Sequence, residues 1–234
     1  MVMLDLEFMA STFKYVLSAI PMTIMLTLVP LALGLVIGVS LCIIRIKKVP
    51  VASGIVSVFY SFFRSCPLIV LIFLSYYGIP KFINIVFYGG VRKITMVNIS
   101  SVEASLFTMT LYASAFLGEI MRGALLSVDT GQTDAAYSLG LGKTATFRYI
   151  VFPQALRIAV PNICNFCIGL LKGSSVVFGI GVVDMMAAAK IRAEAGYRYI
   201  EAYMLVGILY VILAFIIDGL FKQLSKYLAR GYQT

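Results

Sequence analysis

Charged residues and histidine are scarce in this sequence. Of its 234 residues only 12% are charged, 61% are hydrophobic, and none is histidine. A soluble domain usually carries about 25% charged residues, so this chain cannot cover itself with a polar surface, and most of that surface must face lipid. Without histidine, paired reactive carboxylates or a nucleophile beside a base, the sequence offers no catalytic group of the usual kinds. We therefore expect no enzymatic activity.

The four cysteines do not form a metal or redox site by pattern. Cys164 and Cys167 have the C-x-x-C spacing of such sites, but redox motifs of this kind lie near a βαβ pattern. A zinc site needs more ligands than a chain without histidine or a second C-x-x-C provides. We interpret the cysteines as small apolar side chains and expect neither a metal nor a cofactor.

The net charge of +9 is expected of a membrane protein, because Lys and Arg gather near the cytoplasmic ends of spans. It is no indication of nucleic-acid binding, since no basic cluster lies beside the polar or aromatic surface that such proteins use. The acidic start, with Asp5 and Glu7, lacks the basic region of a signal peptide. The first apolar run is therefore expected to remain as a span.

Five stretches are long and apolar enough to cross a bilayer, which takes about 20 residues. They are approximately Tyr15–Ile44, Val51–Tyr77, Val102–Leu126, Ala155–Leu171 and Tyr203–Phe221. Pro67 should bend the second. The stretch 174–189 is short and rich in Gly and Ser, so we interpret it as a short or re-entrant helix buried against protein. The sequence thus predicts an all-α integral membrane protein with about five transmembrane helices.

The basic residues indicate on which side of the membrane each connection between spans lies. Arg45, Lys47 and Lys48 mark the end of the first span as cytoplasmic. Alternation then puts the 127–153 connection and the basic C-terminus inside and the N-terminus outside, although several Lys and Arg residues depart from this pattern. The expected regions are an external segment (1–17), a transmembrane domain (18–222, with a cytoplasmic loop at about 128–153) and a basic cytoplasmic tail (223–234).

The cytoplasmic loop carries the most specific pattern. Thr130 is suited to cap a short helix, Asp134 complements the positive end of its dipole, and Gly140 supplies a stop. A second short helix, 144–152, is expected to end before Pro153. Two short helices at the inner membrane face are suited to be gripped by a soluble partner.

Gly142-Lys143-Thr144 imitates the end of a phosphate-binding loop. The full motif needs a glycine where Tyr137 stands and a preceding strand. ATP must therefore be bound by a partner.

Ionisable and polar residues within the spans form a second group of candidates. Charged groups are costly in lipid, so Arg64, Glu119 and Arg122 should face protein or a watery cavity. Glu119 and Arg122 are three residues apart and can pair along one helix face. Each admits a structural or a pathway role, and the same holds for the Gly- and Ser-containing segment that holds Lys172, Ser174 and Ser175.

In its motifs the chain resembles the permease subunits of binding-protein-dependent (type I) ABC importers, in the polar amino-acid branch. The resemblance is carried by 131–140, by 152–157 with Pro161, and by four further runs in the same order: 60–68, 116–124, 171–175 and 183–184. Departures are modest. Asp134 stands where the family usually has Glu, Ser65-Cys66 where it often has Gly-Thr, and Gly173-Ser174 where it often has Asp-Thr.

This resemblance implies a multi-pass subunit in the inner (plasma) membrane of a prokaryote, working by alternating access. It implies two such permease subunits, identical or paired with a sister, two ATPase subunits and an external amino-acid-binding protein. Cystine and the basic and amide amino acids are candidate substrates. The residues implied in ATPase coupling are Gly131, Gln132, Asp134, Ala135, Ala136, Leu139, Gly140 and Leu141. An ion-driven secondary transporter and a non-transporting assembly subunit are the alternatives.

Overall fold

Every regular element of the described residues is helical. The computed structural model describes residues 5–88 and 99–229. The elements are α1 (Leu6–Ser18), α2 (Ile20–Ile46), α3 (Ala52–Ser65), α4 (Leu68–Phe73), the π-helical turn η1 (Leu74–Gly78), α5 (Ile79–Tyr88), α6 (Ser101–Leu126), α7 (Thr130–Ser138), α8 (Lys143–Thr146), the π-helical turn η2 (Phe147–Val151), α9 (Phe152–Gly173), the 3₁₀ helix η3 (Ser174–Ile180), α10 (Met185–Gly196) and α11 (Tyr199–Ala229). The predicted all-α membrane fold is confirmed.

Four helical stretches have the length and apolar character of membrane spans: Leu6–Ile46, Ser101–Leu126, Lys143–Ile180 and Tyr199–Ala229. The bent pair Ala52–Ser65 and Leu68–Ile83, whose helices meet at 110°, makes a fifth if the two halves form one span. The break falls at Cys66 and Pro67, where a bend was predicted. The prediction of about five spans agrees with this count.

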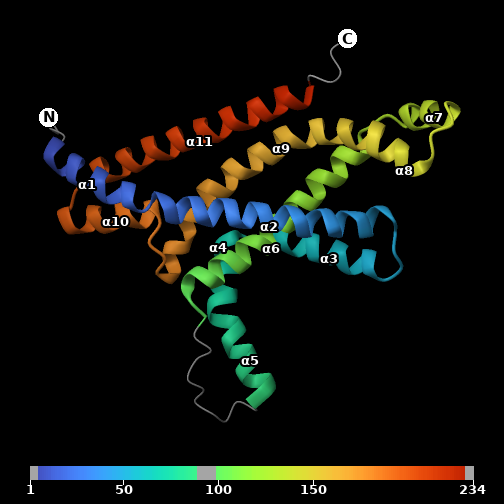
Figure 1. Cartoon of the computed structure of the whole chain (residues 1–234). Helices are drawn as coiled ribbons and strands as arrows, with labels where there is room; N and C mark the ends of the chain where they lie inside the picture. The colour runs from blue at the N-terminus through green and yellow to red at the C-terminus, as the bar shows by residue number, and fades with distance from the viewer. Residues whose placement is uncertain (1–4, 89–98, 230–234) are drawn as a thin grey trace.

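The first and last spans are longer than the sequence pattern indicated. Helix α1 begins at Leu6, inside the expected external segment (1–17), and packs with α10 and α11, where Val16 and Met185 share a buried cluster. Residues 1–4 of that segment and 230–234 of the expected tail lie outside the described residues. Figure 1 shows α1 and α10 at one end of the molecule and α7 and α8 at the other.

The centre of the fold is a close contact between α2 and α6. A Cβ on Gly38 would lie 2.6 Å from the carbonyl oxygen of Ser114 and 2.8 Å from the backbone nitrogen of Gly118. Only small residues allow two helix backbones to approach this closely. The hydroxyl of Tyr60, on α3, donates to the carbonyl of Gly38 at 3.3 Å. Three helices are thereby fixed along one seam.

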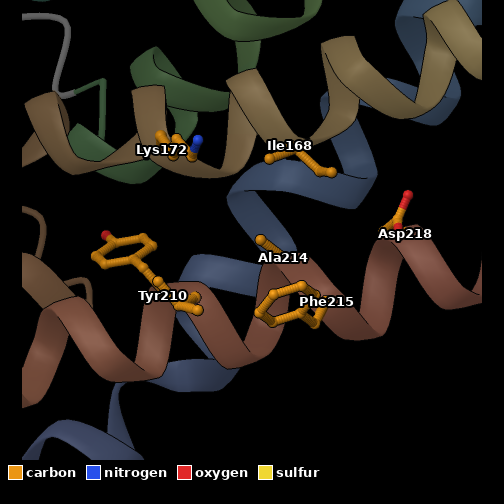
Figure 2. A pocket seen from close by; sticks show the side chains of 7 residues that line it. Ile168, Lys172, Tyr210, Ala214, Phe215 and Asp218 are labelled. Carbon is orange, nitrogen blue, oxygen red and sulfur yellow. The ribbon is translucent and has the colours of Figure 1, made fainter.

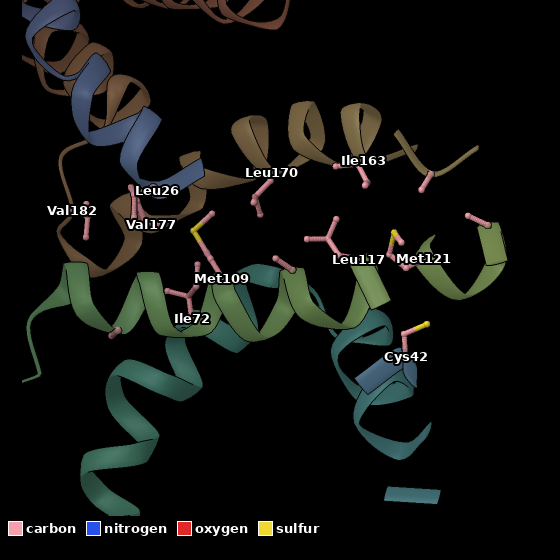
Figure 3. Close-up of a cluster of buried hydrophobic side chains, with 14 of the residues drawn as sticks. Leu26, Cys42, Ile72, Met109, Leu117, Met121, Ile163, Leu170, Val177 and Val182 are labelled. Atoms are coloured by element: carbon pink, nitrogen blue, oxygen red, sulfur yellow. The ribbon is translucent and has the colours of Figure 1, made fainter. Parts of the chain in front are cut away.

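Apolar side chains fill the space between this seam and α9. Met109, Leu117 and Met121 of α6 meet Ile163 and Leu170 of α9 in one buried cluster (Figure 3). Helix α9 therefore packs on this core with one side and against α11 with another.

The stretch after α9 does not cross the bilayer by itself. Helix α10 has 12 residues, about 18 Å at 1.5 Å per residue, against a hydrocarbon thickness of about 30 Å. Its first turn is anchored in protein, because the N–H of Met185 donates to Thr23 Oγ1 at 3.0 Å. The stretch 174–189, predicted to be a short or re-entrant helix, holds the 3₁₀ helix η3 and the start of α10, with a break at 181–184 between them.

Asp184 precedes α10 and is completely buried. It accepts hydrogen bonds from the N–H of Ala187 at 2.9 Å and from the Tyr210 hydroxyl at 3.2 Å. Burial raises the pKa of this carboxyl above its ordinary value, and these hydrogen bonds oppose the rise. Asp184 thus joins α10 to α11.

Candidate functional site

Helix α7 begins one residue earlier than the sequence pattern predicts. Asp129, and not Thr130, is its N-cap, because the Asp129 carboxylate accepts the N–H of Gly131 at 2.7 Å. Thr130 is the first residue of the helix. The expectation of a Thr130 cap was wrong, since a carboxylate directly before it meets the same N–H groups with a full charge.

The end of α7 is closed by a Schellman motif. Gly140 has φ +83°, a left-handed conformation that glycine adopts without steric cost. Its N–H donates to the carbonyl of Tyr137 at 2.9 Å, and the N–H of Leu141 donates to that of Ala136 at 3.1 Å. These are the two bonds that define the motif. The predicted stop at Gly140 is confirmed.

The outer surface of α7 is open. Leu139 is 81% exposed and stands at the tip of the helix. Gly131, Gln132, Asp134, Ala135 and Gly140 are also exposed, whereas Leu141 is half-buried. Ala136 is buried, at 3% exposure, so it packs inside the chain and is not available to a partner. The side-chain amide of Gln154 donates to Gln132 at 3.4 Å and links α7 to α9.

The second short helix of the loop does not end before Pro153. Helix α8 passes through η2 into α9, and Pro153 stands in the first turn of α9. The π-helical turn changes the hydrogen-bonding register directly before the proline, and in a first turn the missing proline N–H removes no helical bond. The loop is therefore joined to the fourth span by continuous helix.

Glu119 is the centre of an ion network near the end of α6. It accepts hydrogen bonds from Arg122 at 3.0 and 3.1 Å, the pairing that their spacing predicts. Arg45 of α2 also donates to Glu119, and Arg64 of α3 lies 3.6 Å from it. Glu119 is 15% exposed. One carboxylate thus holds guanidinium groups from three helices.

Arg45 was missed as a member of this network. The sequence presents it beside Lys47 and Lys48 as one of several cytoplasmic charges, and only the close α2–α6 seam brings it to Glu119. Arg64, half of whose side chain is exposed, also lies over the ring of Phe116 at 5.6 Å. Arg64 is therefore held toward α6 by a carboxylate and an aromatic ring.

The remaining candidates separate into buried and exposed groups. Ser174 is completely buried and donates to the carbonyl of Leu171 at 2.8 Å, which indicates a structural role. Ser175 donates to the carbonyl of Lys172 at 2.8 Å. Lys172 is exposed and lines a cavity of about 270 Å³ between α9 and α11. Figure 2 shows Lys172 on α9 across from Tyr210 on α11, with Asp218 further along α11.

One face of α9, which begins with the exposed Ile158, becomes polar further along the span. Asn162, Asn165, Gly169 and Lys172 are exposed and recur every three to four residues. We call these four residues the α9 polar face. Amide and ammonium groups are costly in hydrocarbon, so this face requires water or another protein surface.

The long apolar helices define a membrane protein. The chain belongs to the family described as the binding-protein-dependent transport system inner membrane component, whose model matches residues 30–230. Members of this family are transport components of the inner membrane and not enzymes. The predictions of no enzymatic activity and of an inner-membrane location agree with this membership.

Relatives and a solved structure support this family assignment. A probable amino-acid permease protein of Bacillus subtilis is 35% identical over 99% of both chains. An L-cystine transport system permease protein of the same organism is 35% identical over 88% of this chain and 84% of its own. The crystal structure of an amino acid ABC transporter with histidines matches with a TM-score of 0.83 and 26% identity, covering 97% of this chain and 100% of that one. The predicted ABC-importer permease fold is confirmed.

The described residues include no cluster of three or more metal-ligating side chains, and the cysteines among them are free.

Proposed function

We propose that this permease imports a polar amino acid, with α7 as the helix through which separate ATPase subunits drive it. The observation that carries the proposal is Leu139, 81% exposed at the tip of a helix that is capped at both ends. A fully exposed leucine on a rigid support is suited to enter a pocket on a partner, since apolar side chains in pockets supply much of the binding energy at interfaces. Asp134, on the same helix, is available to meet basic groups there.

The continuous helix from α8 into α9 supports transmission of movement. Because α7 packs against α8 and η2, a displacement of α7 is passed to a membrane span without an intervening flexible loop. Glu119, two turns before the end of α6, ties α2 and α3 to the other side of the same loop. A force on α7 therefore reaches four spans.

The α9 polar face is the proposed wall of the pathway. It is supported from behind by the core, and its amide and ammonium groups suit a zwitterionic substrate better than lipid. We place a second permease subunit, identical or a sister, across this face, so that the pathway lies between the two. Two ATPase subunits on the α7 helices and an external amino-acid-binding protein complete the assembly, with the N-terminus outside and the C-terminus in the cytoplasm.

The substrate class rests on relatives. Matched permeases of at least 26% identity are named for transport of L-cystine, octopine and arginine. What these compounds share is the amino-acid zwitterion with a further polar group. We propose a substrate of this kind, with cystine and the basic and amide amino acids as candidates.

Uptake by vesicles tests the proposal. The permease is purified with its co-expressed ATPase and reconstituted into vesicles, and the binding protein is added outside. These vesicles should take up radiolabelled L-cystine, L-arginine or L-glutamine only when they contain ATP. Uptake that needs an ion gradient and no ATP would instead identify a secondary transporter.

Two matched variants separate docking from general damage. Leu139→Asp should abolish co-purification of the ATPase, whereas Leu6→Asp, at a leucine that is 76% exposed at the opposite end of the molecule, should leave it unchanged. Equal ATPase recovery with both variants contradicts docking at α7.

A further inference from the structure

Helix α9 is by itself long enough to cross the membrane. Its 22 residues measure about 33 Å at 1.5 Å per residue, against a hydrocarbon core of about 30 Å. The helical residues before it are therefore expected at the membrane surface. These are residues 143–151, comprising α8 and η2, and we call them the interfacial segment.

The exposed side chains of this segment are those of a membrane interface. Phe147 is 49% exposed, Tyr149 60%, and Phe152, at the start of α9, 39%. Phe147 and Phe152 lie side by side with ring centroids 5.9 Å apart. Aromatic rings are enriched where hydrocarbon meets headgroups, and these three are presented where a span leaves the bilayer.

Positive charge lies among these rings and is not paired with an acidic side chain of the described residues. Lys143 and Arg148 are exposed, and the Arg148 guanidinium lies 5.8 Å from the centre of the Tyr149 ring. No ion pair of the described residues involves either of them. The sequence has no Asp or Glu from Ala135 to Val183. The nearest acidic residues in the sequence, Asp134 on the neighbouring α7 and Asp129 at its N-cap, form no ion pair with Lys143 or Arg148, so both basic groups are open to a negative ligand from outside the chain.

We propose that the interfacial segment binds the headgroup of an anionic phospholipid. Arg148 and Lys143 donate to its phosphate oxygens, and Phe147 and Phe152 pack against the upper part of its acyl chains. Juxtamembrane Lys and Arg residues gain favourable energy from anionic lipid, and the guanidinium fork matches phosphate in two places. The proposal depends on membrane placement of the chain and not on the proposed ATPase coupling or substrate.

The absence of tryptophan from the chain allows a direct test. Phe147→Trp places a single reporter in the permease, and its fluorescence is taken as the difference from the unmodified complex. The purified complex is reconstituted with brominated phosphatidylglycerol or brominated phosphatidylcholine, which quench the reporter when bound beside it. Phe215→Trp, at a residue 71% exposed on α11, is the matched reporter for lipid contact away from the segment.

At position 147 the relative binding constant should favour phosphatidylglycerol over phosphatidylcholine by about five-fold for each contributing basic residue, and at position 215 the ratio should be close to one. Arg148→Gln and Lys143→Gln should each lower the preference at position 147 by about five-fold, while Lys190→Gln, at a basic residue on α10, should leave it unchanged. Inorganic phosphate in excess should not remove the preference, because it lacks acyl chains.

Three results would overturn the proposal. Equal quenching by both lipids at position 147 shows apolar anchoring without headgroup selection. No quenching by either lipid shows that protein covers the segment. Loss of the preference in inorganic phosphate identifies a free-anion site.

Discussion

Small residues serve opposite purposes in the α2–α6 seam and in α7. In the seam, Gly38 and Gly118 bring two backbones into contact, and the surrounding side chains are buried. In α7, Gly140 ends the helix and leaves Leu139 in solvent. The seam is held by contacts between two backbones, whereas α7 contacts mainly the short α8 and η2 beside it. This difference fits the proposal that the seam belongs to a rigid body and that the ATPase subunits act on α7.

Gly38→Val tests the close packing of α2 against α6 and should have the largest effect on stability. Its Cβ meets backbone atoms of α6 at 2.6 and 2.8 Å, which cannot move aside as a flexible side chain does. Overpacking of this kind costs about 3 kcal/mol, measured as a loss of thermal stability and of folded protein in detergent. Gly123→Val, on α6 where a Cβ meets nothing within 4 Å, is the control, and equal losses for both variants contradict the close seam.

Glu119→Gln should have the next largest effect. It leaves the guanidinium groups of Arg45, Arg64 and Arg122 without their shared carboxylate, and a hydrogen bond to a charged group contributes about 2 kcal/mol. Thermal unfolding should detect this loss. Glu194→Gln, which removes only a surface pair with Lys190, should cost about 0.3 kcal/mol. A Glu119 variant as stable as the Glu194 variant shows that the network contributes nothing to the rigid body.

Gly140→Asp tests the proposal that the ATPase subunits dock on α7. A side chain in the left-handed conformation costs about 1 kcal/mol, too little to remove the protein from the membrane, yet a carboxylate beside Leu139 should abolish uptake at matched abundance. Gly140→Asn adopts the same conformation more readily and adds no charge, so it should retain part of the uptake. Uptake by the Asp variant equal to that of the unchanged protein counts against docking at this end of α7.

Arg64→Gln should have the smallest effect on stability. Its ion pair is long and half exposed, so the loss should be at most about 0.5 kcal/mol. If Arg64 serves the pathway, uptake falls while thermal stability hardly changes. If uptake and substrate-stimulated ATPase activity are unaltered, the pathway role is excluded, and if thermal stability is unaltered as well, neither a structural nor a pathway role survives.

Local patterns were predictable from the sequence, whereas long-range contacts were not. The apolar runs give the spans, and the spacing of Glu119 and Arg122 gives their pairing because both lie on one helix. The stop at Gly140 follows from glycine alone. Arg45 joins the network only through the seam, and Thr23 meets Met185 across 162 residues, so no local pattern reports either contact.

Two local expectations failed where neighbouring residues competed. Asp129 displaced Thr130 as the cap because both stand at the helix start and the carboxylate is the stronger acceptor. Pro153 did not end a helix, because the π-helical turn before it places the proline in a first turn. Propensity alone does not reveal such a turn, since residues 147–151 carry no proline or glycine.

The most direct test of a rigid bundle driven at one exposed helix is a photo-crosslink from position 139. A photoreactive phenylalanine analogue replaces Leu139 in the assembled complex, with Leu6 replaced in a parallel preparation. We expect an adduct between position 139 and an ATPase subunit, and none from position 6. If position 139 gives no adduct with another subunit, or is labelled only by reagents confined to the outer side of the membrane, α7 is not the point at which this permease is driven.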